Sequence, residues 1–296
     1  GIHVVQTATV TKGLAGKELV DMDSLKEAAG FTDDGKPLLS EELVEEALRR
    51  GLQALGFSGH SYNEPDRDFA MSREAAAEYR SVIAGLKEKY RGKIRIYCGI
   101  EQDYFSEEPT DAYDYVIASV HYVKKGERYL AVDESAEALK NAVEQCYNGD
   151  FDALSEAYFS LEADVLRKIN GDIIGHFDLV SKYSEANGYS TRSERFLAAA
   201  EKAVNALAPY GKPFEINTGA IARGIRTIPY PAPDILNMIF RAGGEIILSS
   251  DCHRKDKLDC AFEEAATAAY QAGFRRRAVL TENGMAYLPL RNEKIG

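Results

Sequence analysis

Short apolar segments alternate with stretches of helical periodicity along most of this 296-residue chain. Strands at this spacing, separated by helices, predict an α/β protein with a parallel sheet. Roughly seven or eight such units favour a (β/α) barrel over a doubly wound sheet, and we expect one domain spanning residues 1–296. The predicted strands lie at 2–10, 54–58, 94–100, 115–120, 172–174, 213–217, 245–249 and 277–280. Examples of the predicted helices are the stretches 41–51, 73–91, 151–169, 192–210 and 259–273.

Composition excludes several classes of protein. Hydrophobic residues make up 45% of the chain, enough for a sizeable core, and the net charge of -11 argues against a nucleic-acid or membrane partner. No apolar run reaches the length of a membrane span, and the first residues lack a signal-peptide pattern. The four cysteines show no CxxC spacing, which is typical of a reducing compartment. We therefore expect a cytoplasmic protein.

Four of the five histidines follow predicted strands directly. Two acids, Glu101 after IYCGI and Asp251 after IILSS, occupy equivalent positions. The carboxyl ends of barrel strands build the active site, so we expect all six side chains to converge at one mouth. A set of hydrogen-bonded core histidines is the alternative, but it would require four coincidences. The four motifs are LGFSGHSY (His60), VIASVHYV (His121), DIIGHFDL (His176) and ILSSDCHR (His253).

Converging imidazoles and carboxylates point to a metal centre. These are the ligands that Zn, Mn or Fe prefer in proteins. They outnumber what one ion needs, so we expect two or three divalent metal ions. Such centres clamp phosphate oxygens and lower the pKa of a water that attacks phosphorus. The pattern therefore predicts a small phosphorylated substrate.

A glycine-rich loop after the predicted strand at 213–217 offers contacts for that phosphate. The segment FEINTGAIARGIRTIPYP carries Arg223 and Arg226 in an otherwise acidic protein. Guanidinium groups bind phosphate through two hydrogen bonds at once, although either arginine could instead be solvated at the surface. Glu215 and Asn217 face the same side of the strand, so we expect Asn217 to contact substrate or to support the metal ligands.

In this order the motifs resemble those of the PHP (polymerase and histidinol phosphatase) family, and within it the histidinol-phosphate phosphatases. The resemblance spans about residues 34 to 284. It implies a distorted (β/α)7, TIM-like barrel with up to three divalent metals, and hydrolysis of L-histidinol phosphate as a phosphomonoesterase. The matching segments are GFSGHSY, GIEQDYF, YDYVIASVHYV, DIIGHFDLV, FEINTGAIARG and ILSSDCHRKD.

The same resemblance implies a role for each predicted ligand. Glu101 would bridge two metals and Asp251 would reach the first, which places both in the catalytic centre. His121 and His176 would complete the second metal. His60 and His253 would belong to the third.

The opening strand departs from the family pattern. In the family it ends in His-x-His, whereas IHVVQTATV has Gln6 and Ala8 at the corresponding places. Glutamine is a poor zinc ligand and alanine is none, so we expect a weak first metal position. Either the strand keeps its place without ligands, or residues 1–30 replace it. Carboxylates that could serve instead are Asp21, Asp23, Asp33 and Asp34.

Three functions stay open at this point. The first is a metal-dependent phosphomonoesterase acting on L-histidinol phosphate. The second is a catalytically weakened relative that binds metal or phosphate ligands, favoured by the missing His-x-His. The third is another metal hydrolase of the same architecture. The lack of a lysine at a strand end argues against an amidohydrolase, and the acidic composition argues against a nuclease.

Overall fold

The structure is a computed structural model that describes residues 41–66 and 70–290. The strand predicted at 2–10 lies outside these ranges. The residues discussed above that are not described are Gln6, Ala8, Asp21, Asp23, Asp33 and Asp34.

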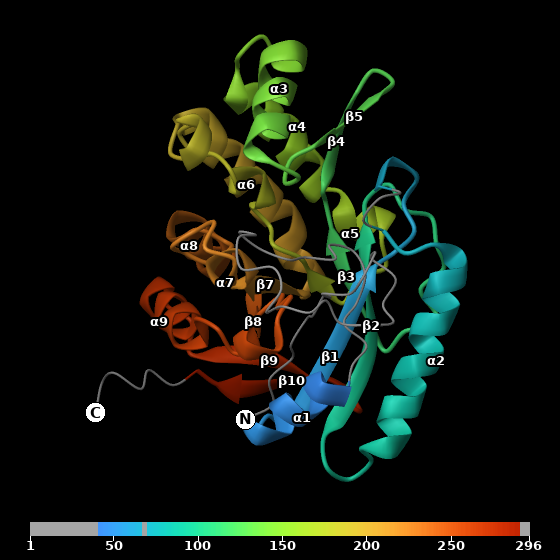
Figure 1. The fold of residues 1–296 in the computed structure, drawn as a ribbon. Coiled ribbons are helices and arrows are strands. Elements are labelled where there is room, and N and C mark those ends of the chain that lie inside the picture. Colours follow the sequence, from blue (N-terminus) through green and yellow to red (C-terminus); the bar gives the residue numbers. More distant parts are fainter. Residues whose placement is uncertain (1–40, 67–69, 291–296) are drawn as a thin grey trace.

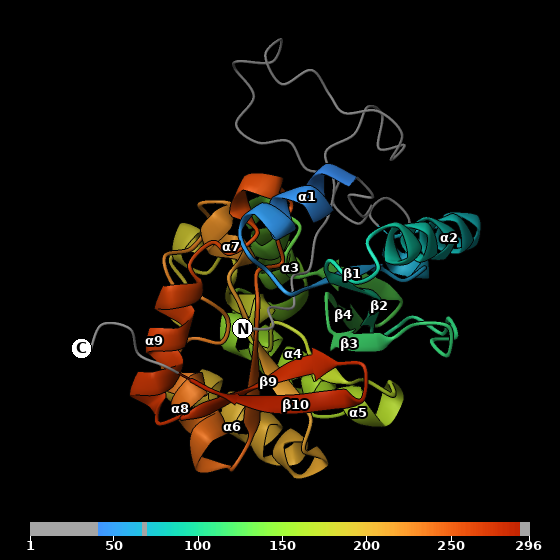
Figure 2. The same ribbon diagram turned by 90° about the horizontal axis from the view of Figure 1, so that it is seen from below.

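An eight-stranded sheet forms the centre of the described part of the chain (Figure 1). All neighbouring strands run parallel except the last, which is antiparallel to the strand before it. The sheet curls into part of a barrel, so the carboxyl ends of its parallel strands lie around one mouth (Figures 1 and 2). In spatial order the strands are β1 (Ala54–His60), β2 (Arg95–Asp103), β3 (Tyr115–Ser119), β6 (Ile173–Ile174), β7 (Pro213–Asn217), β8 (Glu245–Ser249), β9 (Arg276–Thr281) and β10 (Gly284–Pro289).

Helices surround the outer face of this sheet (Figure 1). Four of them begin at a side-chain cap, where Ser72, Ser135, Asp150 or Ser193 accepts a hydrogen bond from a backbone N–H three residues later. None of the helices in the described ranges is long and apolar enough to cross a membrane. The helices are α1 (Glu41–Arg49), α2 (Arg73–Lys89), α3 (Ala136–Tyr147), α4 (Phe151–Glu162), α5 (Val165–Lys168), α6 (Glu194–Leu207), α7 (Gly219–Ala222), α8 (Pro233–Arg241) and α9 (Phe262–Ala272).

Each strand predicted between residues 54 and 280 is present, with differences in detail. β2 continues to Asp103, so Glu101 lies inside this strand rather than after it. It pairs there with Ile117 of β3, and the surrounding imidazoles make a charged residue tolerable within a strand. The helix predicted at 151–169 is two helices, α4 and α5.

The sequence patterns did not reveal the antiparallel hairpin of β4 (Tyr122–Lys125) and β5 (Arg128–Ala131). Most side chains of these strands are at least partly exposed, so they lack the apolar run that marks a buried strand. Helices α3, α7 and α8 and strand β10 were also not among the elements predicted by residue range, and α7 lies in the segment predicted as a glycine-rich loop. The hairpin follows His121 immediately and therefore forms a wall beside the candidate site.

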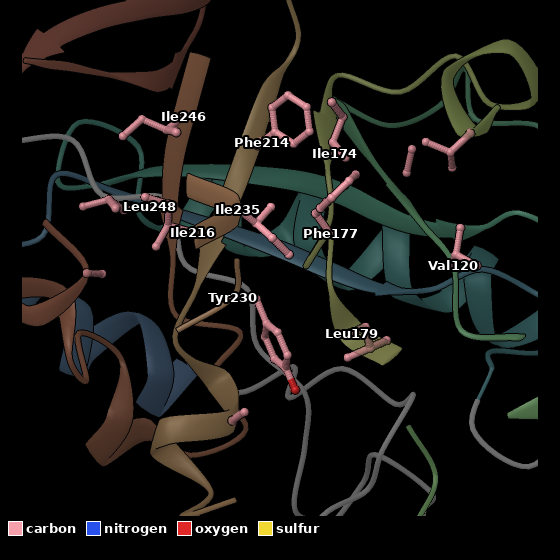
Figure 3. Packing of buried hydrophobic residues seen from close by; sticks show 14 of the residues in the cluster. Val120, Ile174, Phe177, Leu179, Phe214, Ile216, Tyr230, Ile235, Ile246 and Leu248 are labelled. Carbon is pink, nitrogen blue, oxygen red and sulfur yellow. The ribbon is translucent and has the colours of Figure 1, made fainter. Parts of the chain in front are cut away.

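A close-packed aromatic and aliphatic core fixes the backbone near the site (Figure 3). Ile174 and Phe177 are fully buried on either side of His176. The ring of Phe177 packs edge to face against Phe214 of β7, with centroids 5.5 Å apart. Buried anchors before and after His176 leave little freedom for its backbone, which is how apolar packing positions a polar side chain.

Candidate metal centre

The six side chains predicted as ligands all line one cavity at the carboxyl ends of the strands. The cavity volume is about 80 Å³. The predicted ligands are His60, Glu101, His121, His176, Asp251 and His253. The remaining lining residues are Asp66, Tyr122, Ala131, Asp133, Glu134, Leu179, Lys182 and Arg223.

Glu101 lies at the centre of this cluster and is 2% exposed. Its Oε1 lies 2.8 Å from His176 Nε2 and 3.3 Å from His121 Nε2. Its Oε2 lies 3.7 Å from His60 Nε2. One carboxylate from β2 therefore meets imidazoles that follow or end three different strands.

The electrostatics of Glu101 follow from these contacts. Burial disfavours its charged form, but the imidazole of His60 and the hydrogen bonds from His121 and His176 outweigh burial and hold the pKa well below its usual range. Burial also lowers the pKa of His121, but its hydrogen bonds to Asp103 and Glu101 prevail and raise that pKa well above the ordinary value. The site thus strongly favours a negative carboxylate with positive charge around it.

Asp103 orients one of these imidazoles. Its Oδ2 accepts a hydrogen bond from His121 N (2.9 Å) and faces His121 Nδ1 at 3.2 Å. Its Oδ1 accepts from Asn63 Nδ2 and Phe105 N, each at 2.8 Å. A carboxylate behind one ring nitrogen leaves the other directed into the site, as at many metal-bound histidines. Sequence analysis did not single out Asp103, although it shares a strand face with Glu101.

Glu215 and Asn217 support the base of the site from β7. Glu215 Oε2 accepts hydrogen bonds from His176 N (2.9 Å) and Asn217 Nδ2 (3.1 Å), so the two side chains face the same way. Asn217 Oδ1 accepts from Gly219 N at 2.8 Å. Both residues are fully buried, and neither is among the cavity-lining residues. A contact between Asn217 and substrate stays a prediction. In the structure Asn217 hydrogen-bonds Glu215 and the backbone of Gly219, and so supports the site from behind.

The donor set fits a divalent metal. One donor atom from each of His60, Glu101 and His121 lies within 4.8 Å of the others. Imidazole nitrogens and carboxylate oxygens suit zinc, manganese or iron. His176 Nε2 is hydrogen-bonded to the same carboxylate, so a fourth donor is at hand. The residues present thus fit a metal ion in residue type and spacing.

Asp251 and His253 lie on the side of the cavity formed by the loops after β7 and β8. Arg223 Nη2 lies 3.4 Å from Asp251 Oδ2, and Arg223 Nη1 lies 3.0 Å from the ring nitrogens of His253. Asp251 has a left-handed backbone (φ 41°), which is uncommon outside glycine. The guanidinium predicted to bind phosphate is therefore in direct contact with two predicted metal ligands.

The second predicted arginine and a lysine have different positions. Arg226 lines the neighbouring cleft, where its guanidinium donates to Ser181 Oγ and lies 4.2 Å from the ring centroid of Tyr230. Its predicted phosphate contact stays a prediction. Lys182 lines the cavity itself and donates to Asp133 O (2.8 Å) and Oδ2 (3.1 Å). The sequence feature that could have pointed to Lys182 is its position six residues after His176, in the segment HFDLVSK.

A curled parallel sheet with imidazoles and carboxylates at its strand ends defines this protein as a barrel with a candidate metal centre. The family model described as PHP domain matches residues 33–219, which is more than half of the chain. The chain belongs to the PHP domain family.

Similar proteins agree with this assignment. The histidinol-phosphatase of Bacillus subtilis is 28% identical over 254 residues, which cover 79% of this chain and 94% of that protein. A dihydroorotase of Clostridium acetobutylicum is 55% identical, but over only 54 residues, 18% of this chain and 13% of that enzyme. So short a match carries no inference about activity.

Two solved structures show the fold. The putative histidinol phosphatase of Listeria monocytogenes has a TM-score of 0.72 at 17% identity, covering 88% of this chain and 99% of that one. The histidinol phosphate phosphatase of Lactococcus lactis has a TM-score of 0.62 at 21% identity, covering 96% and 98%. The latter is described as complexed with zinc, L-histidinol and phosphate. The predicted PHP-type, TIM-like barrel is confirmed.

Proposed function

We propose that the protein is a metal-dependent phosphomonoesterase that hydrolyses L-histidinol phosphate to L-histidinol and phosphate. The convergence of four imidazoles, two carboxylates, Arg223 and Lys182 in one cavity carries this proposal. The histidinol-phosphatase of Bacillus subtilis, similar over most of both chains, supports the choice of substrate.

The residues of the cavity would have two roles, holding metal ions and positioning the metal ligands. His60, Glu101, His121 and His176 would hold metal on one side, and Asp251 and His253 would complete a second position on the other. A bound divalent metal supplies Lewis acidity toward phosphate oxygens and lowers the pKa of a water molecule. Asp103 keeps the His121 ring turned toward Glu101, and Glu215 holds the backbone of His176.

Two cations of the chain would bind the phosphate dianion. Arg223 can donate two parallel hydrogen bonds, whereas Lys182 presents a single point charge. Both would also offset the charge that builds on phosphoryl oxygens during the reaction. Glu101 and Asp251 belong to the reacting centre because they face the same space as these cations.

We propose that one or two metal ions are held firmly and that the first metal position is weak or vacant. The described residues supply the donors named above, and the places of the family's His-x-His carry Gln6 and Ala8, outside the described residues. Zinc, manganese and iron all suit the donor set. We also expect the enzyme in the cytoplasm, because its four cysteines are free thiols.

Metal analysis and a phosphate-release assay on the same preparation test the proposal. The purified protein should contain about one to two equivalents of divalent metal. It should release phosphate from L-histidinol phosphate, lose that activity with chelator and regain it when zinc or manganese is restored. Full metal content without turnover would favour the catalytically weakened relative, and absence of both would refute the proposal.

A further inference from the structure

Besides the predicted ligands, the lining of the cavity carries three carboxylates, and their surroundings differ. Asp66 Oδ1 accepts a hydrogen bond from Tyr122 OH at 2.8 Å. Asp133 is paired with Lys182. The carboxylate of Glu134 has neither a hydrogen bond nor an ion pair with any residue in the described ranges, and it is exposed. Of the three, Glu134 is the one that is exposed and has no side-chain partner within the described ranges.

We propose that Glu134 binds a positively charged group on the alcohol part of the substrate, which makes the enzyme selective for amine-bearing phosphate monoesters. The inference rests on the proposed phosphomonoesterase activity and names the residue that would choose among its substrates.

The depth of the cavity determines which end of a substrate meets Glu134. Glu101, His121 and His176 are buried, whereas Glu134 is exposed, so the metal ligands form the floor and Glu134 lies at the mouth. A phosphoryl group bound at the buried metal ligands would therefore direct its alcohol toward the exposed side of the cavity, where Glu134 lies.

The backbone around Glu134 is held in place by hydrogen bonds. Lys182 Nζ donates to Asp133 O at 2.8 Å, and Tyr183 OH donates to Glu134 O at 3.4 Å. Ser135 caps α3 by accepting from Ala138 N at 3.0 Å. The side chain of Glu134 thus projects from a fixed backbone, and a binding group that is already positioned loses less entropy when its ligand arrives.

The lining of the cavity carries charges of both signs. Arg223 contacts the predicted metal ligands Asp251 and His253, and Glu134 is exposed to solvent. A substrate with phosphate at one end and ammonium at the other matches both. A substrate with a second anionic group would be repelled by Glu134. The same residue would therefore attract substrates that carry an ammonium group and disfavour substrates that carry a second negative charge.

Steady-state kinetics on two esters test the proposal directly. The esters are L-histidinol phosphate and the analogue that lacks only its amino group. For Glu134→Gln we expect KM to rise roughly five- to twenty-fold with the amine-bearing ester and kcat to stay within about two-fold. KM for the analogue should not change. The matched control is Glu127→Gln, an exposed glutamate in the turn between β4 and β5 that does not line the cavity; it should behave as wild type with both esters.

An equal rise in KM for both esters, or no rise for either, would overturn the role of Glu134. Calorimetric binding of L-histidinol needs no turnover and separates this inference from the activity itself. Binding should be weaker to Glu134→Gln than to Glu127→Gln. If no ester were hydrolysed, the proposed activity would fail while calorimetry still decided the role of Glu134: weaker binding supports it, and equal binding refutes it.

Discussion

Glu101 is the residue on which the candidate metal centre depends, because it is a buried carboxylate in contact with three imidazoles. A buried negative charge is costly without compensation, so the surrounding positive charge must come from protonated imidazoles or from metal ions. Substitutions of the residues around Glu101 should therefore lower the metal content while the fold stays intact.

Replacing His176 with alanine should remove metal and activity together. The imidazole nitrogen lies 2.8 Å from Glu101 Oε1, so its loss takes a donor from the centre. We expect at least a hundred-fold lower rate of phosphate release and less bound metal by elemental analysis. Circular dichroism should show an intact fold. Full metal content at full rate would remove His176 from the centre.

The two arginines after β7 should differ in their effect on substrate binding. Arg223→Lys should raise KM for a phosphate monoester about ten-fold, because lysine cannot donate two parallel hydrogen bonds to phosphate. Arg226→Lys is the matched comparison, and we expect a smaller rise because Arg226 lines the neighbouring cleft. The measurement is KM for both variants at saturating metal. Equal effects would contradict the separate positions of the two arginines.

Glu162 should make stability depend on pH. It is fully buried on α4, where Tyr158 OH donates to its Oε1 at 2.8 Å, and burial raises the pKa of this carboxyl well above 4.5. The folded protein therefore keeps a proton that the unfolded chain releases, and stability falls as the pH rises above about 4.5.

Urea unfolding of Glu162→Gln at several pH values checks this expectation. The variant cannot ionise, so between pH 5 and 8 it should gain about 1–3 kcal/mol relative to wild type. Glu144→Gln, at an exposed position on α3, is the control and should show no such trend. A constant difference between Glu162→Gln and wild type across this range would mean that Glu162 titrates normally.

At the scale of elements, β2 and β3 approach closely because of one glycine. A Cβ atom at Gly99 would overlap the ring of Tyr115. That ring is fully buried inside the curled sheet, and its hydroxyl donates to Phe57 O of β1 at 3.1 Å. The contact thus ties together the three strands that carry His60, Glu101 and, just beyond the last of them, His121.

Gly99→Ala should consequently destabilise the protein by about 1–3 kcal/mol or more, because the buried ring has no room to move. Gly85→Ala is the matched control: Gly85 lies in α2 with no heavy atom near the added carbon, and alanine there should stabilise the helix by up to about 1 kcal/mol. Urea unfolding of both variants measures the two effects. If Gly99→Ala were as stable as Gly85→Ala, β2 and β3 would be able to separate enough to accommodate the added methyl group.

For the whole molecule, metal binding should be coupled to stability. The ligands come from β1, β2 and the segments after β3, β6 and β8, so an unfolded chain cannot bring them together. Metal at a hundred times its Kd should stabilise the folded state by about 2.7 kcal/mol. Thermal unfolding with and without zinc should show a higher Tm in wild type and a smaller rise in His176→Ala. Identical shifts in both proteins would indicate binding elsewhere.

The order of strands and helices, and the meeting of His60, Glu101, His121 and His176 at one mouth, follow from local patterns. Apolar runs define the strands, and a parallel sheet places all their carboxyl ends together whatever the detailed packing. The contribution of Asp103 was equally accessible, because alternate residues of a strand face the same way.

Other features depend on how loops fold back over the mouth. Lys182 and Glu134 line the cavity because the Lys182–Asp133 contact joins segments 49 residues apart, and no periodicity encodes such a contact. Arg223 and Arg226 are three residues apart in one loop yet line different hollows, since a loop has no fixed period to assign its side chains a side. Local hydrogen-bonding and hydrophobic patterns depend on residues that are close in the sequence, so the sequence alone predicts them. Contacts between distant segments form only when the chain packs, so they require the tertiary structure.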